Sequence, residues 1–118
     1  MIQYISIDGN GIGKIIEASI IFNDVEHLSV VSRKISVVIK ASEEFLIEKG
    51  ANIHMSGGDN ILASIKLTDD IVKSITDLSN NEIIDFSIGI GQSPRESYLA
   101  LKAAKAKKAT VLYYASIQ

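Results

Sequence analysis

The sequence predicts an α+β fold in which helices pack on a mainly antiparallel sheet in the ferredoxin-like βαββαβ order. Three observations support this fold class: short alternating apolar stretches at both ends of the chain, a glycine pair between two apolar stretches, and longer stretches with helical periodicity. The chain has 118 residues, of which 47% are hydrophobic, and this suits one domain with its own core. We therefore expect a single domain over residues 1–118.

The first half of the chain is expected to form a strand followed by two helices. Residues 2–8, "IQYISID", alternate apolar and polar side chains, which is typical of a strand that ends at Asp8. After the glycine-rich segment "DGNGIG", the apolar spacing in "KIIEASIIFND" predicts a short helix that begins near Ile12. Residues 24–49 place apolar side chains close to a helical period and precede Gly50, so they predict the longest helix.

A β-hairpin is expected over residues 51–65, followed by a helix. The short apolar stretches "ANIHM" and "NILASI" flank Gly57 and Gly58, and glycine is favoured in tight hairpin turns because it lacks a Cβ atom. Thr68 is a candidate N-cap, and the acidic residues after it suit the first turn of a helix. We expect this helix to end near residue 79.

The last part of the chain is expected to form a strand, a helix and a short final strand. Residues 82–91, "EIIDFSIGIG", alternate large apolar residues with Asp85, Ser87 and Gly89, which predicts a strand with small residues on one side. Asp85 and Ser87 could line a site from this side of the strand, but we interpret them as surface polar residues. The segment "SPRE" that begins at Ser93 fits a capping box, so a helix starts there and continues through the lysines. "TVLYY" predicts the final strand.

Composition and charge narrow the possible functions. The formal net charge is -2, which does not favour a broad basic surface for duplex nucleic acid. No stretch approaches the roughly 18 apolar residues of a membrane span, so we expect neither duplex nucleic acid nor membrane as a partner. The absence of cysteine excludes disulfides and thiolate ligands, and the start "MIQYISID" lacks the pattern of a signal peptide. We expect a cytoplasmic location.

Asp8 and Asp59 are candidate metal ligands because the predicted sheet brings them together. A ferredoxin-like sheet places the first strand beside the hairpin, so the end of that strand lies near the hairpin turn. Two carboxylates at this point supply the oxygen ligands that Mg²⁺ prefers and leave other positions for water and phosphate. Each acid also fits an ordinary structural role, because Asp8 can cap the next helix and Asp59 can be a plain turn residue.

Two further features suit phosphate, although each also fits an ordinary structural role. Backbone N–H groups of the segment "GNGIGK" can bind an anion before a helix, although the segment matches neither GxGxxG nor the P-loop pattern. It can equally be a simple strand-to-helix connection. Lys102, Lys105 and Lys108 recur at every third position of the last helix, so they form one stripe that can face either phosphate or solvent.

Four motifs in order resemble those of the GGDEF and CRISPR-type palm nucleotide cyclases and polymerases, and in particular the minimal CRISPR polymerase family. They are "YISIDGNGIGK", "SGGDNILA", "FSIGIG" and "ALKAAKAKK", and the similarity spans residues 4–108. The resemblance implies a palm fold in which Asp8 and Asp59 are catalytic and, with the carbonyl of Gly9, bind Mg²⁺ or Mn²⁺. It further implies that a nucleotide and its phosphates contact Asn10, Gly11, Ile12, Gly13, Gly57, Gly58, Asn60 and Lys105.

Asn60 departs from the pattern of this family. Diguanylate cyclases have glutamate at the matching position, and the large CRISPR palm subunits have a second aspartate. An amide brings no negative charge to a metal and cannot act as a carboxylate base. The departure argues against a diguanylate cyclase in particular. It is compatible with metal activation of a ribose hydroxyl, which does not need this side chain.

The resemblance implies a metal-dependent nucleotidyltransferase that makes a cyclic di- or oligonucleotide from ATP, or less readily from GTP, in bacterial anti-phage defence. The expected partners are the nucleoside triphosphate, a second copy of the chain in a symmetric homodimer, and a separately encoded effector that responds to the product. Three alternatives remain open. They are an enzyme similar to archaeal GTP cyclohydrolase III, a palm that binds nucleotide without turnover, and a plain structural domain.

Overall fold

The helices and strands follow the predicted order in a computed structural model that describes residues 1–79, 81 and 83–117. The α+β fold class is confirmed. The elements are β1 (Ile2–Gly9), α1 (Ile12–Ile21), α2 (Val25–Glu48), β2 (Asn52–Gly57), β3 (Asn60–Lys66), α3 (Asp69–Ser79), β4 (Phe86–Gly91), α4 (Pro94–Lys107), β5 (Val111–Tyr113) and the 3-10 helix η1 (Tyr114–Ser116).

The last two strands are shorter than their sequence patterns predict. The strand predicted over residues 82–91 begins only at Phe86, and residue 82 lies outside the described residues. Ile84 precedes β4, but its side chain is only 2% exposed. The apolar side of the alternating pattern therefore marks burial in the core and extends further than the strand itself. The strand predicted for "TVLYY" is limited to Val111–Tyr113 because the chain then enters η1.

Among the described residues, β1 is the central strand of a five-stranded sheet with the order β2-β3-β1-β4-β5. β1 pairs antiparallel with β3 and β4, β2 pairs antiparallel with β3, and β5 lies parallel to β4. In the register of β1 and β3, Asp8 is opposite Asn60. The end of β1 therefore lies beside the hairpin turn, as the predicted sheet requires.

The two faces of the sheet carry side chains of different size. One face packs with α2 and α3 in the main hydrophobic core, and its strand residues are Ile5, Ile7, Ile61, Ala63, Ile65, Phe86, Ile88 and Ile90. On the opposite face, α4 packs against β4 and β1. A Cβ atom at Gly89 would collide with the backbone of Ser97 and Leu101. The small residues predicted for one side of β4 therefore let α4 lie close to the sheet.

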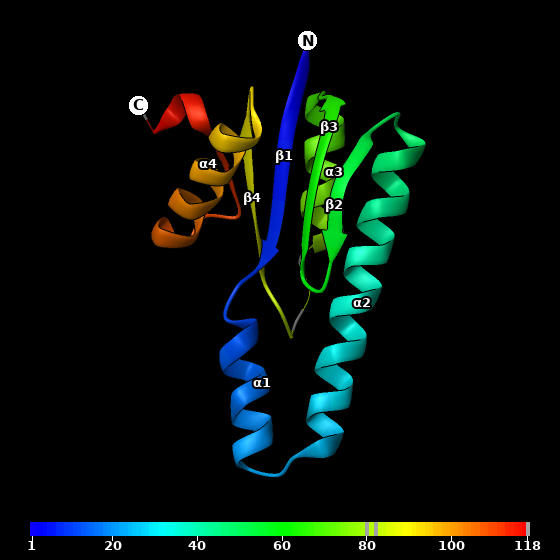
Figure 1. Cartoon of the computed structure of the whole chain (residues 1–118), viewed down its shortest axis with the longest axis vertical. Coiled ribbons are helices and arrows are strands. Elements are labelled where there is room, and N and C mark those ends of the chain that lie inside the picture. The colour runs from blue at the N-terminus through cyan, green and yellow to red at the C-terminus, as the bar shows by residue number, and fades with distance from the viewer. Residues whose placement is uncertain (80, 82, 118) are drawn as a thin grey trace.

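One end of the sheet gathers the segments that the sequence associates with function. Figure 1 shows that the end of β1, the turn between β2 and β3 and the start of β4 lie at the same end. From there, α1 and the first half of α2 extend beyond the strands (Figure 1). None of the described helices is long and apolar enough to cross a membrane.

Candidate active site

Two aspartates meet where β1 ends beside the hairpin turn. The N–H of Gly9 donates a hydrogen bond of 3.0 Å to the carbonyl oxygen of Asp59, which joins the turn to the strand end. The carboxyl groups of Asp59 and Asp8 are close enough to influence each other's protonation. Burial raises the pKa of Asp59, and the neighbouring carboxyl of Asp8 raises it further, whereas a backbone hydrogen bond and the charge of Lys105 lower it. The two acids singled out by the sequence are thus neighbours.

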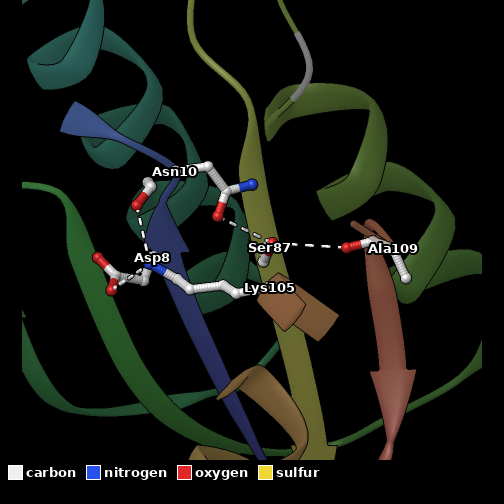
Figure 2. Close-up of polar contacts among 6 residues, drawn as sticks. Asp8, Asn10, Ser87, Lys105 and Ala109 are labelled. Atoms are coloured by element: carbon white, nitrogen blue, oxygen red, sulfur yellow. Dashed lines mark hydrogen bonds and ion pairs between the residues drawn. The ribbon is translucent and has the colours of Figure 1, made fainter. Parts of the chain in front are cut away.

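Lys105 of α4 supplies a cation at the same point. Its Nζ donates a hydrogen bond of 2.9 Å to Asp8 Oδ2 and another of 2.9 Å to the carbonyl oxygen of Gly9. Figure 2 shows the lysine reaching from its helix across to Asp8. The two charged side chains are only about one quarter exposed, at 26% and 25%. A positive charge is therefore already held by oxygen atoms of two of the three residues expected to bind metal.

These groups form a chemically suitable cation site. Asp8 and Asp59 offer carboxylate oxygens and Gly9 offers a carbonyl oxygen, which are the hard ligands preferred by Mg²⁺ and Mn²⁺. The ammonium group of Lys105 already acts as a stand-in cation there. Within the described part of the chain, no group of three or more His, Cys, Asp or Glu side chains is placed to hold a metal. The site thus combines two acids with a backbone oxygen.

The glycine-rich connection between β1 and α1 lies against these acids. A Cβ at Gly9 would come within 2.6 Å of the side chain of Ile12 and 3.2 Å of an Asp59 carboxylate oxygen. Gly11 is the N-cap of α1 and has a φ of 65°, a left-handed conformation that glycine adopts without strain. The side chain of Ile12 is buried against Gly9, and Gly13 is exposed in the first turn of α1.

Asn10 is positioned by β4 and by the segment before it. Its N–H donates a hydrogen bond of 2.8 Å to the carbonyl oxygen of Asp85, and its Oδ1 accepts one of 3.0 Å from Ser87 Oγ. Ser87 Oγ also lies 3.5 Å from the carbonyl oxygen of Ala109 (Figure 2). Ser87 is fully buried, so its interpretation as a surface residue is wrong. The signal for its role was its place on the small-residue side of the strand.

A cavity of about 650 Å³ opens beside Asn10, large enough for a small-molecule ligand. Among the described residues that line it, three are lysines and one is an acid; the lining comprises Asn10, Gly11, Lys14, Asp85, Phe86, Lys105, Lys108, Ala109 and Thr110. Lys14 received no role from the sequence, although it directly follows the glycine motif. Thr110 had no sequence signal, because its place depends on how the chain leaves α4.

A smaller hollow of about 150 Å³ adjoins the acids on another side. Asp8 and Asn60 contribute to its lining together with mainly apolar residues, namely Ser6, Ile7, Met55, Ile61, Leu62, Pro94, Tyr98 and Leu101. Lys102 lies over the ring of Tyr98, with Nζ 5.2 Å from its centroid. Lys102 therefore interacts with an aromatic face, whereas Lys105 and Lys108 line the larger cavity.

The hairpin turn leaves open space next to the acid pair. Gly58 has a φ of 54°, whereas Gly57 ends β2 without a positive φ. A Cβ at either position would meet no described atom within 4 Å. The backbone conformation therefore explains the presence of glycine at position 58 only. Both glycines are exposed to solvent.

A five-stranded sheet with an acid at the end of its central strand, a second acid in the adjacent hairpin and a lysine from α4 defines a palm domain of the nucleotide cyclase and polymerase type. The sequence model of the minimal CRISPR polymerase domain, mCpol, matches residues 4–114. The chain belongs to this family. A comparison with curated proteins gives no significant match.

Solved structures of GGDEF proteins share this fold. An EAL/GGDEF domain protein from M. capsulatus superposes with a TM-score of 0.65 at 17% identity, covering 96% of this chain and 84% of that one. The GGDEF domain of DgcB from Caulobacter crescentus, in complex with c-di-GMP, gives 0.65 at 14% identity, with 96% and 75% covered. The diguanylate cyclase SiaD from Pseudomonas aeruginosa, in complex with its activator SiaC, gives 0.69 at 13% identity, with 95% and 49% covered. At these low identities, the TM-scores show a common fold and nothing more.

Proposed function

We propose that this palm domain, over residues 1–118, is a Mg²⁺-dependent nucleotidyltransferase that joins nucleoside triphosphates into a cyclic di- or oligonucleotide. ATP is the preferred substrate and GTP the second choice. The observation that carries the proposal is the cation held by Asp8 and Gly9 beside Asp59, next to a cavity lined by lysines. A nucleoside triphosphate suits this arrangement, because its reacting phosphate can lie at the cation site while its other phosphates contact the lysines.

Asp8, Asp59 and the carbonyl of Gly9 would hold the metal. When bound, Mg²⁺ or Mn²⁺ supplies Lewis-acid chemistry that lowers the pKa of a ribose hydroxyl and offsets charge at the α-phosphate. The chain itself would orient the substrate. Lys14, Lys105 and Lys108 give the cavity a positive character that suits a triphosphate.

Backbone groups complete the proposed nucleotide site. The segment from Asn10 to Gly13 leads into α1, where free N–H groups and the helix dipole favour a phosphate. The open space at Gly57 and Gly58 suits the approach of a nucleotide to the acids. Asn60 lies opposite Asp8 and would contact the nucleotide through its amide, since it cannot add a third carboxylate.

Ring closure between two nucleotides requires a second bound substrate that faces the first. We therefore expect two copies of the chain to form a symmetric homodimer with the sites at their interface. The product would act on a separately encoded effector in bacterial anti-phage defence, as expected for a CRISPR polymerase domain in the cytoplasm. A palm that binds nucleotide without turnover is the second candidate, because Asn60 replaces an acid at the turn.

Product analysis tests the proposal directly. Purified protein is incubated with each nucleoside triphosphate and Mg²⁺ or Mn²⁺, and the products are identified by mass spectrometry. Pyrophosphate together with a cyclic nucleotide is the expected result, and Asp59→Asn should abolish it. A formylated pyrimidine from GTP would instead indicate chemistry similar to GTP cyclohydrolase III. Nucleotide binding without any product would indicate a sensor, and unchanged cyclisation by Asp59→Asn would refute the metal assignment.

A further inference from the structure

Lys105 binds the same oxygen atoms that the proposed function assigns to the metal. We propose that its ammonium group occupies the metal position in the substrate-free protein and leaves it when a triphosphate enters the neighbouring cavity. Metal and triphosphate then bind in a mutually dependent way. This regulation rests on the proposed function, because it concerns the same site.

The geometry makes the lysine and a metal ion alternatives at this position. Nζ lies 2.9 Å from Asp8 Oδ2 and 2.9 Å from the carbonyl oxygen of Gly9. A magnesium ion bound to the same two oxygens would lie about 2.0–2.1 Å from each of them. Both cations would then occupy nearly the same place between two oxygens. Overlap and like-charge repulsion therefore exclude simultaneous binding.

The cavity offers the displaced lysine a second position. Lys105 already lines it, together with Lys14, Lys108 and the backbone at Asn10 and Gly11. In the absence of an anion, lysines in one cavity repel each other, so the ammonium of Lys105 is better placed on Asp8. A triphosphate reverses this preference because it brings several negative charges into the cavity.

Lys105 is able to move because only its helix is fixed. Ala104 and Leu101 of α4 are buried against the sheet, whereas the Lys105 side chain is about one quarter exposed. A lysine has a long stem with several rotatable bonds, so its charged end can shift without movement of the backbone. Exchange between the two positions therefore needs a change of side-chain rotamer alone.

This arrangement predicts a defined linkage. A triphosphate that draws Lys105 away raises the affinity for metal, and metal raises the affinity for triphosphate by the same factor. Direct contact between metal and phosphate also contributes to such coupling. The contribution of Lys105 is therefore isolated best by measuring metal binding with no anion present.

Mn²⁺ binding to the full chain, measured by isothermal titration calorimetry without nucleotide, tests the proposal. Lys105→Met keeps the length of the side chain and removes its charge, and we expect Mn²⁺ affinity to rise about tenfold, the effect of losing one charge-assisted competitor. Lys105→Gln should give a similar increase, whereas Lys105→Arg, which keeps a cation, should not. Circular dichroism establishes that each variant is folded.

Lys108→Met is the matched control because it removes the same charge from the same cavity but leaves the ammonium on Asp8. An equal rise in Mn²⁺ affinity for Lys108→Met and Lys105→Met would refute site-specific competition and indicate a general electrostatic effect. Unchanged affinity in Lys105→Met would also refute the proposal.

Two more variants separate this inference from the proposed function. Asp8→Asn and Asp59→Asn should weaken Mn²⁺ binding strongly, and unchanged binding in both would refute the metal site itself. Inorganic tripolyphosphate supplies the second measurement. It should raise the Mn²⁺ affinity of the wild-type chain by a larger factor than that of Lys105→Met, and equal factors would overturn the linkage.

Discussion

The two faces of β1 show how the molecule divides stability from its candidate site. Ile5 and Ile7 point to the core with α2 and α3 and are at most 1% exposed. Between and after them, Ser6 lies 2.8 Å from Ser97 of α4 through their hydroxyl oxygens, and Asp8 binds Lys105. One face is thus stabilised by packing of apolar side chains. The other is stabilised by hydrogen bonds, an ion pair and the close approach of the α4 backbone to the sheet. Changes of volume should have different consequences on the two faces.

Removing volume from the apolar face should produce the largest loss of stability. Ile88 is completely buried at the centre of β4, so Ile88→Ala leaves a cavity and should lower the free energy of unfolding by about 3 kcal/mol. Urea unfolding followed by circular dichroism measures this change. Val37→Ala on the exposed side of α2 is the control, with an expected change within about 0.5 kcal/mol. A similar, small effect for both variants would contradict the division.

Hydrophobic periodicity made much of this division predictable. The alternation around Ser6 identified the first strand, and the alternation around Ser87 and Gly89 identified a second strand with small residues on one side. Element order then implied that the first strand pairs with the hairpin, so the meeting of Asp8 with Asp59 followed from topology. These inferences depend on local periods and on the few ways in which such elements can pack.

The contacts that other residues make depend on long-range packing, and local periodicity does not reveal them. Lys105 reaches Asp8 because α4 lies directly on β4, and this distance is set by the absence of a side chain at Gly89. The lysine stripe by itself did not show which lysine reaches the acids, and it was the family resemblance that singled out Lys105 for phosphate and not for Asp8. Likewise, Ser87 looked like a surface residue until α4 and Asn10 covered it.

Adding volume to the α4 face should produce the next largest effect. A Cβ at Gly89 would collide with backbone atoms of α4, so Gly89→Ala should lower the free energy of unfolding by about 2 kcal/mol. Gly13→Ala is the matched control because a Cβ there meets no described atom within 4 Å and lies in a helix. That control should be stabilising by up to about 1 kcal/mol. Urea unfolding compares the pair, and equal effects would show that α4 does not press on the sheet.

Ser42 is an exception on the apolar side and sharpens the comparison. It lies in α2 with 0% exposure, and its hydroxyl has no hydrogen-bond partner among the described residues. A buried hydroxyl without a partner costs free energy, so Ser42→Ala should raise the free energy of unfolding by about 1 kcal/mol. Thermal unfolding detects this as a higher Tm. A lower Tm would show that the hydroxyl is satisfied in solution.

The smallest expected change in the free energy of unfolding concerns Asp59, whose negative charge should destabilise the folded protein at neutral pH. Because burial and Asp8 raise its pKa above the ordinary value of 3.8, the folded protein holds the proton more tightly than the unfolded chain. This contribution favours folding at low pH and is lost as the pH rises through the raised pKa. Asp59→Asn should therefore gain stability relative to the wild type between pH 4 and pH 7.

Urea unfolding of both proteins at these two pH values measures that gain, and the difference cancels the titration of groups that do not interact with Asp59. A difference that stays constant, or that favours the wild type at pH 7, would contradict the assignment. The expected gain is smaller than the other effects because Asp59 is partly open to solvent, which screens its charge. If it is observed while Asp59→Asn also abolishes nucleotide joining, the acid is retained for its chemistry at a cost in stability.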